Sequence, residues 1–169
     1  MNGKRLVAVL VLALMSLGLV GPAHAATTFT ARLSAGQEVP ANESKGRGAA
    51  VFQLSADGTE LRYRLIVANI DNVVAAHIHV APEGANGPVV AFLYGNAAAG
   101  GGAVNGVLAT GTITAADLVG PLAGSDLSVL AATMAAGNTY VNVHTNDGVA
   151  PTNTGPGDLA GGEIRGQIG

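Results

Sequence analysis

The stretch Glu60-Leu-Arg-Tyr-Arg-Leu-Ile-Val67 decides the fold class, because it alternates apolar and charged side chains. Successive side chains of a strand point to opposite faces of its sheet, so Arg62 and Arg64 are expected in solvent and the apolar set in a core. That apolar set is Leu61, Tyr63, Leu65 and Val67. Asp57-Gly58 precedes the stretch and is a strong hairpin signal, which pairs it with Ala49–Leu54.

Short runs of the same kind follow one another along the chain, separated by Gly, Pro, Asn and Asp. This pattern is typical of an all-β sandwich or barrel. The further runs expected as strands are Thr28–Ser34, Val73–Val80, Val89–Tyr94, Val107–Thr112, Thr139–Thr145 and Glu163–Ile168. The sequence thus predicts about eight strands in a single domain that covers residues 26–169.

The segments between these runs predict loops and one or two short helices. Thr114–Asp117 begins like a helix, because Thr114 can cap the first turn and Asp117 favours its positive end. A second short helix is expected over Asp126–Ala136, ended by Gly137. Asn96–Gly106 has no periodic face and is interpreted as a mobile loop, and Asn146–Gly162 is interpreted as a long loop.

Residues 1–25 carry the pattern of a secretory signal peptide. Lys4 and Arg5 precede an apolar run, Leu6–Val20, and the small residues of Ala23-His24-Ala25 follow. The apolar run has 15 residues, whereas a membrane span needs about 20. We therefore expect cleavage after Ala25 and a secreted protein, periplasmic or extracellular, with no membrane span after cleavage.

Charge and composition exclude several classes of function. Lys4 and Arg5 are two of the eight basic residues, so six remain after cleavage against eleven acidic ones, a net charge of −5. No nucleic-acid partner is expected for such a chain. The absence of cysteine excludes disulfides, thiolate-bound metals and a cysteine nucleophile. No Gly-x-Ser-x-Gly, P-loop or dinucleotide motif is present to support hydrolysis or nucleotide chemistry.

Three histidines remain after the expected cleavage, and two of them form His77-Ile78-His79. On a strand, His77 and His79 project from one face with Cα atoms roughly 6.5–7 Å apart. Ile78 points the other way, into the expected core. Two imidazoles placed like this can bind one ion.

His144 ends the run Tyr140–His144, in which Tyr140, Asn142 and His144 share the face opposite the core. It becomes a third ligand if its strand lies beside that of His77 and His79, an adjacency on which the sequence is silent. Three imidazoles without sulfur ligands suit one copper or zinc ion, with a fourth position open to water or substrate.

A plainer interpretation competes, in which the histidines are polar surface of an exposed sheet face. Asn142, Glu163 and Arg165 are the candidates for supporting the histidines. Glu163 and Arg165 share one face of the last strand. An ion pair that closes the sheet is the preferred interpretation, and the alternative is that they support the centre, with Glu163 accepting a histidine ring N–H or Arg165 guiding an anion.

Four segments, in order, resemble the CHRD domain family, which is named for its repeats in chordin. They are Phe29–Pro40, Ala76–His79 with Asn86–Val90, Tyr140–Thr145 and Gly162–Gln167. The resemblance implies an immunoglobulin-like β-sandwich or barrel without a settled activity. His77, His79 and His144 match the His-x-His and Val-His-Thr motifs of the family. Chordin binds extracellular growth factors, but no residue here marks such a surface, so any extracellular protein partner stays unspecified.

His77 and His79 are also similar to the His-x-His pair among the copper ligands of copper-zinc superoxide dismutase, a Greek-key barrel. This chain departs from that family in lacking a disulfide and a histidine-rich zinc loop. Three functions stay open: a secreted module that binds copper, zinc or another ligand through the three histidines, a dismutase-like copper redox enzyme, or a metal-free adhesive or structural module.

Overall fold

The computed structural model describes residues 27–95 and 97–169, so the expected signal peptide lies outside the described residues. The described chain forms eight strands. They are β1 (Thr27–Ser34), β2 (Arg47–Leu54), β3 (Leu61–Asp71), β4 (Val73–Val80), β5 (Val89–Tyr94), β6 (Ala103–Ile113), β7 (Thr139–Thr145) and β8 (Ile164–Gln167). The all-β prediction is confirmed.

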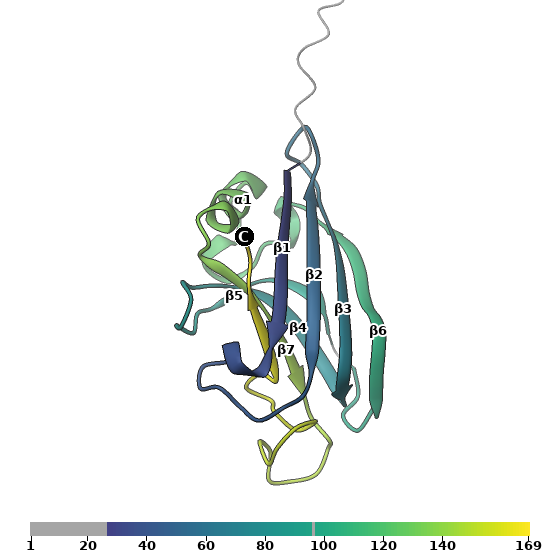
Figure 1. Ribbon diagram of the computed structural model, residues 1–169. Helices are drawn as coiled ribbons and strands as arrows, with labels where there is room; N and C mark the ends of the chain where they lie inside the picture. The colour runs from purple at the N-terminus through teal and green to yellow at the C-terminus, as the bar shows by residue number, and fades with distance from the viewer. Residues whose placement is uncertain (1–26, 96) are drawn as a thin grey trace, which may run out of the picture.

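The strands form one antiparallel sheet in the order β5-β4-β7-β8-β1-β2-β3-β6. The two end strands, β5 and β6, contact each other, so the sheet curls into a nearly closed barrel (Figure 1). The Tyr63 hydroxyl on β3, the neighbour of β6, donates a hydrogen bond of 2.7 Å to the Leu93 carbonyl on β5 and so helps to close the barrel. The chain passes between the two halves of the sheet, β5-β4-β7-β8 and β1-β2-β3-β6, after β3, after β5 and after β6.

The barrel interior is filled by the apolar faces that alternation predicted. Leu61 and Leu65 are fully buried, Val67 is 1 % exposed, and Phe52 packs beside them from β2. Burial of one such side chain stabilises the fold by about 1.5–3 kcal/mol. Arg62 and Arg64 point outward, as expected.

The short helices are also confirmed. Ala115–Asp117 is a single 3₁₀ turn, in which the Asp117 carboxylate accepts hydrogen bonds from the backbone N–H and the hydroxyl of Thr114, both 2.8 Å long. Helix α1 covers Leu127–Ala135 and lies at one end of the barrel (Figure 1). Two further 3₁₀ turns cover Ala35–Gln37 and Gly120–Leu122. No helix in the described part of the chain is both long enough and apolar enough to cross a membrane.

The loop predicted over Asn96–Gly106 is wrong for its second half. Strand β6 already begins at Ala103, because β3 continues to Asp71 and pairs with it there. Backbone hydrogen bonds hold this pairing, and they need no alternation of side chains. The pairing of β3 with β6 has a register shift between Val67 and Ile70. This shift interrupts the alternation of apolar and polar side chains from which the end of the strand could have been predicted.

The core makes a direct prediction. Leu65→Ala should lower the free energy of unfolding by about 2–5 kcal/mol, since it leaves a cavity between β2 and β3. Arg64→Ala, one position away but exposed, should change it by less than about 0.5 kcal/mol. Urea denaturation of both variants measures this, and equal losses would contradict the inward orientation of Leu65.

Candidate metal centre

Strands β4 and β7 are neighbours, and their register brings the three histidines together. His79 lies opposite Tyr140, His77 opposite Asn142, and His144 opposite Ala75 on the next outward row. Inward-facing residues of both strands are fully buried in the barrel, so all three histidines project from its outer face. The adjacency on which the sequence was silent is therefore present.

The three imidazoles are close enough to share one ion. One ring nitrogen from each lies within 4.8 Å of the others, and His77 Nδ1 is 3.1 Å from His144 Nε2. Nitrogens bound to one tetrahedral ion at 2.0–2.1 Å lie roughly 3.4 Å apart. The pair of nitrogens 3.1 Å apart thus already lies near the spacing that an ion needs, and a nitrogen of the third ring lies within 4.8 Å.

Two backbone carbonyls fix the ring orientations. His79 Nδ1 is 2.9 Å from the Gly87 carbonyl oxygen, and His144 Nδ1 is 3.0 Å from the Ala160 carbonyl oxygen. A carbonyl only accepts, so each Nδ1 carries the proton and donates it. The Nε2 atom of each ring is then the one with the free lone pair, as in a histidine that binds metal through Nε2.

The Nε2 atom of His79 is the most informative atom of the centre. His79 is 9 % exposed, and its Nε2 is buried without a hydrogen-bond partner. A buried acceptor left unpaired costs about 1–3 kcal/mol. By contrast, His144 Nε2 accepts a hydrogen bond from His77 Nδ1. The His79 lone pair is thus unpaired, in a ring whose centroid lies 5.7 Å from that of His77 and 6.1 Å from that of His144.

Tyr140 and Gly87 hold the His79 ring from two sides. The Tyr140 ring stacks on it at 4.8 Å between centroids and 10° between planes. The Tyr140 hydroxyl accepts the Gly87 N–H at 3.2 Å, so the residue whose carbonyl binds His79 is itself held by the stacked ring. A Cβ at Gly87 would overlap the Val80 carbonyl oxygen, and only glycine fits there.

Burial keeps all three imidazoles in the neutral form that binds metal. It lowers the pKa of His77 to about 4, with smaller contributions from His144 and His79. Burial also lowers the pKa of His79, partly opposed by its hydrogen bond to Gly87. The pKa of His144 is lowered by burial too, against the effect of its bond to Ala160.

The residues expected to support the histidines lie on the same outer face but bind elsewhere. Asn142 is 3 % exposed, and its amide donates to Glu38 Oε2 at 3.2 Å. Burial, against the charge of Arg165, raises the pKa of Glu38 to about 7. The guanidinium of Arg165 lies 3.4 Å from the centroid of the Tyr140 ring, so Arg165 reaches His79 only through that ring.

The ion pair preferred for Glu163 and Arg165 is not formed, and that prediction is wrong. The Glu163 carboxylate instead accepts from the hydroxyls of Ser44 and Thr145, both at 2.6 Å, and from the Gly157 N–H at 2.7 Å. Three neutral donors surround it, so it needs no cation. Arg165 donates to Asn86, Pro82 and Gln167 at 3.3–3.4 Å.

Sequence reasoning missed the groups that orient the histidines. The carbonyls of Gly87 and Ala160 belong to loops. Every residue has a backbone carbonyl, so residue identity does not show which carbonyls bind a histidine. Tyr140 was placed on the correct face, but the stacking depends on the register of β4 and β7. The glycine at position 87, directly before Pro88, was the one available signal.

Comparison with known proteins places this geometry in a family context. A family model described as CHRD domain matches residues 29–168, which is nearly the whole described chain. No curated protein and no solved structure matches the chain. The match includes all three histidines and both loops that supply the orienting carbonyls.

The low pKa of His77 predicts a pH dependence. A histidine whose pKa is lower folded than unfolded binds fewer protons in the folded state, so its contribution is complete above about pH 6.5 and is lost as the pH falls towards 4. The metal-free protein should therefore lose more stability between pH 7 and pH 4.5 than His77→Gln does. Urea denaturation across this range tests it, and Glu38, present in both proteins, cancels from the comparison. Parallel curves would contradict the prediction.

Gly87→Ala predicts a local defect. The added Cβ must displace the loop from Val80, which removes the carbonyl from His79 and lowers the free energy of unfolding by about 1–3 kcal/mol. Nitrogen NMR of the imidazoles should show the His79 proton no longer fixed on Nδ1. Gly36→Ala, where a Cβ meets open space, is the matched control and should leave the free energy of unfolding and the His79 tautomer unchanged. An unaltered His79 tautomer in Gly87→Ala would show that the Gly87 carbonyl does not fix this ring.

Proposed function

This chain belongs to the CHRD domain family over residues 29–168, and we propose that this module binds one copper or zinc ion outside the cytoplasm. The ligands are His77, His79 and His144. Export rests on the signal-peptide pattern of residues 1–25, with the destination periplasmic or extracellular.

A single observation carries the proposal: His79 Nε2 is buried and unpaired, in a ring whose centroid lies 5.7 Å from that of His77 and 6.1 Å from that of His144. In the competing interpretation, in which the histidines are merely polar surface, this lone pair would be in contact with water. It is buried instead, and a bound ion would offset the cost of leaving it unpaired.

The choice of metal follows from the donors. Imidazole nitrogen suits zinc and copper, and the chain has no cysteine to favour a softer ion. The carbonyls of Gly87 and Ala160 set the tautomers of His79 and His144, which is the outer support typical of histidine ligands. Three protein ligands leave a fourth position for water or another ligand.

Binding is better supported than copper redox catalysis. A catalytic centre that attracts an anionic substrate needs an exposed cation beside the open position. Arg165, whose charge helps to lower the pKa of His79, is 1 % exposed and packed against Tyr140. The side chain that does lie in solvent at the centre is apolar: Phe92, 58 % exposed, packs edge-on against His77 at 4.9 Å.

Metal titration tests the function. The metal-free mature protein should bind one equivalent of zinc or copper(II), and His79→Ala should weaken binding at least a hundredfold, because it removes the best-oriented ligand. Competition with a chromophoric chelator measures both affinities. Phe92→Leu changes the same face without removing a nitrogen and should bind as the unmodified protein does.

Two outcomes contradict the proposal. One is that the unmodified protein binds neither metal stoichiometrically, which would leave the metal-free adhesive or structural module. The other is that binding survives when all three histidines are replaced by alanine. Urea denaturation of each variant shows whether a lost site reflects a lost fold.

A further inference from the structure

The outer face of β1, β2 and β3 carries four of the six Lys and Arg residues of the described chain. Arg32, Arg47, Arg62 and Arg64 are all exposed, and each points outward from its strand. They are four of the five arginines in the described chain. The strand segments that pair here, 27–34, 47–54 and 61–68, contain no Asp or Glu.

The strand register sets these arginines along a diagonal path. Arg62 and Arg64 are two residues apart on β3, Arg32 lies on β1 opposite Ala49, and Arg47 lies one row further along β2. Outward residues of a strand are about 7 Å apart and neighbouring strands about 4.8 Å. Successive arginines on the path are thus roughly 7–12 Å apart.

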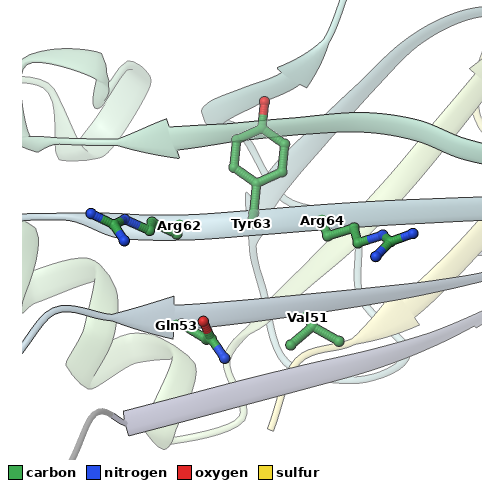
Figure 2. A pocket seen from close by; sticks show the side chains of 5 residues that line it. All are labelled: Val51, Gln53, Arg62, Tyr63 and Arg64. Carbon is green, nitrogen blue, oxygen red and sulfur yellow. The ribbon is translucent and has the colours of Figure 1, made fainter.

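Aliphatic side chains form the floor between these cations. Val51 is 40 % exposed and Ile66 37 % exposed. Figure 2 shows Arg62 and Arg64 extending in opposite directions along β3, with Val51 and Gln53 on the adjacent strand. These four residues and Tyr63 line a shallow hollow of about 290 Å³.

The guanidinium groups are largely uncommitted. Arg62 pairs with Glu60 at 3.1 Å, at the edge of the face, and both side chains are well exposed. Arg47 donates to the adjacent Gly46 carbonyl. In the part of the chain that the structure describes, Arg32 and Arg64 donate no side-chain hydrogen bond. Guanidinium pairs with carboxylate or sulfate through two parallel hydrogen bonds, so these groups are free to bind such anions.

We propose that this arginine face, Arg32, Arg47, Arg62 and Arg64 on β1, β2 and β3, binds an acidic polysaccharide bearing carboxylate or sulfate groups. The net charge of residues 26–169 is −5, so the basic face is not a result of the overall charge. Four arginines gathered on an acidic domain are complementary to a polyanion. The aliphatic floor offers apolar contact to the C–H faces of sugar rings.

Other polyanions fit this face less well. Phe29 and Phe52 on these strands are buried, and Tyr63 is tied to β5 through its hydroxyl, so no aromatic ring of these strands is free to stack on nucleic-acid bases. The sheet is twisted and curled, so a flat membrane would touch only its crest, whereas a flexible chain can follow the diagonal path. The histidine centre lies on β4 and β7, so this proposal does not depend on metal binding.

Binding to defined polymers tests the arginine face. The mature protein should bind polygalacturonate, which carries carboxylates, or dextran sulfate, but not neutral dextran, and binding should weaken steeply with added salt. Arg62→Gln/Arg64→Gln should weaken it about tenfold, at roughly threefold for each exposed charge pair lost. Ala132→Glu/Ala135→Glu on the exposed surface of α1 makes the same change in net charge and should leave affinity within twofold.

The two polymers show whether carboxylate or sulfate is preferred, and either preference supports the proposal. Failure to bind both polymers at low salt would overturn it. Equal weakening by the arginine and α1 variants would also overturn it, because it would show attraction to net charge alone. Tighter binding to anionic phospholipid vesicles or single-stranded DNA would assign the face to a different partner. Unchanged urea midpoints show that the variants remain folded.

Discussion

The antiparallel register of β4 against β7 fixes the geometry of the histidine centre. It sets His79 opposite Tyr140 and places His144 one row beyond the Asn142 that faces His77. A shift by one residue would turn every one of these side chains into the barrel and the valines of β7 out of it. The buried faces of Ile78, Val141 and Val143 therefore hold the histidines in place as firmly as any direct contact.

A layer of loops over β4, β7 and β8 converts an outer sheet face into a buried polar region. The segment around Glu38, the turn at Gly87 and the loop at Ala160 all bind to side chains of this face. Glu163 fastens two of the covering segments by accepting from Ser44 and Gly157. Burial under these loops lowers the pKa values of the histidines, so the cover sets both their geometry and their protonation.

The two halves of the barrel thus have different surfaces built on the same strand pattern. Over β4 and β7 the outward positions are covered and hold neutral imidazoles, whereas over β1, β2 and β3 they are bare and hold arginines. The apolar interior is continuous between the halves, and the Tyr63 hydroxyl joins β3 to the end strand β5. A single rigid core can therefore carry two chemically distinct faces.

The strands, their buried faces and the common direction of His77 and His79 could be predicted from the sequence, because alternation is a local property of an extended chain. So could α1 and the turn at Asp117, whose signals lie within a few residues. The contact of His144 with the pair, the orienting carbonyls of Gly87 and Ala160, and the binding of Glu163 to hydroxyls rather than to Arg165 depend on how distant segments pack. The early start of β6 belongs with these, since strand pairing uses backbone groups common to all residues but proline, and their partners come from distant parts of the chain.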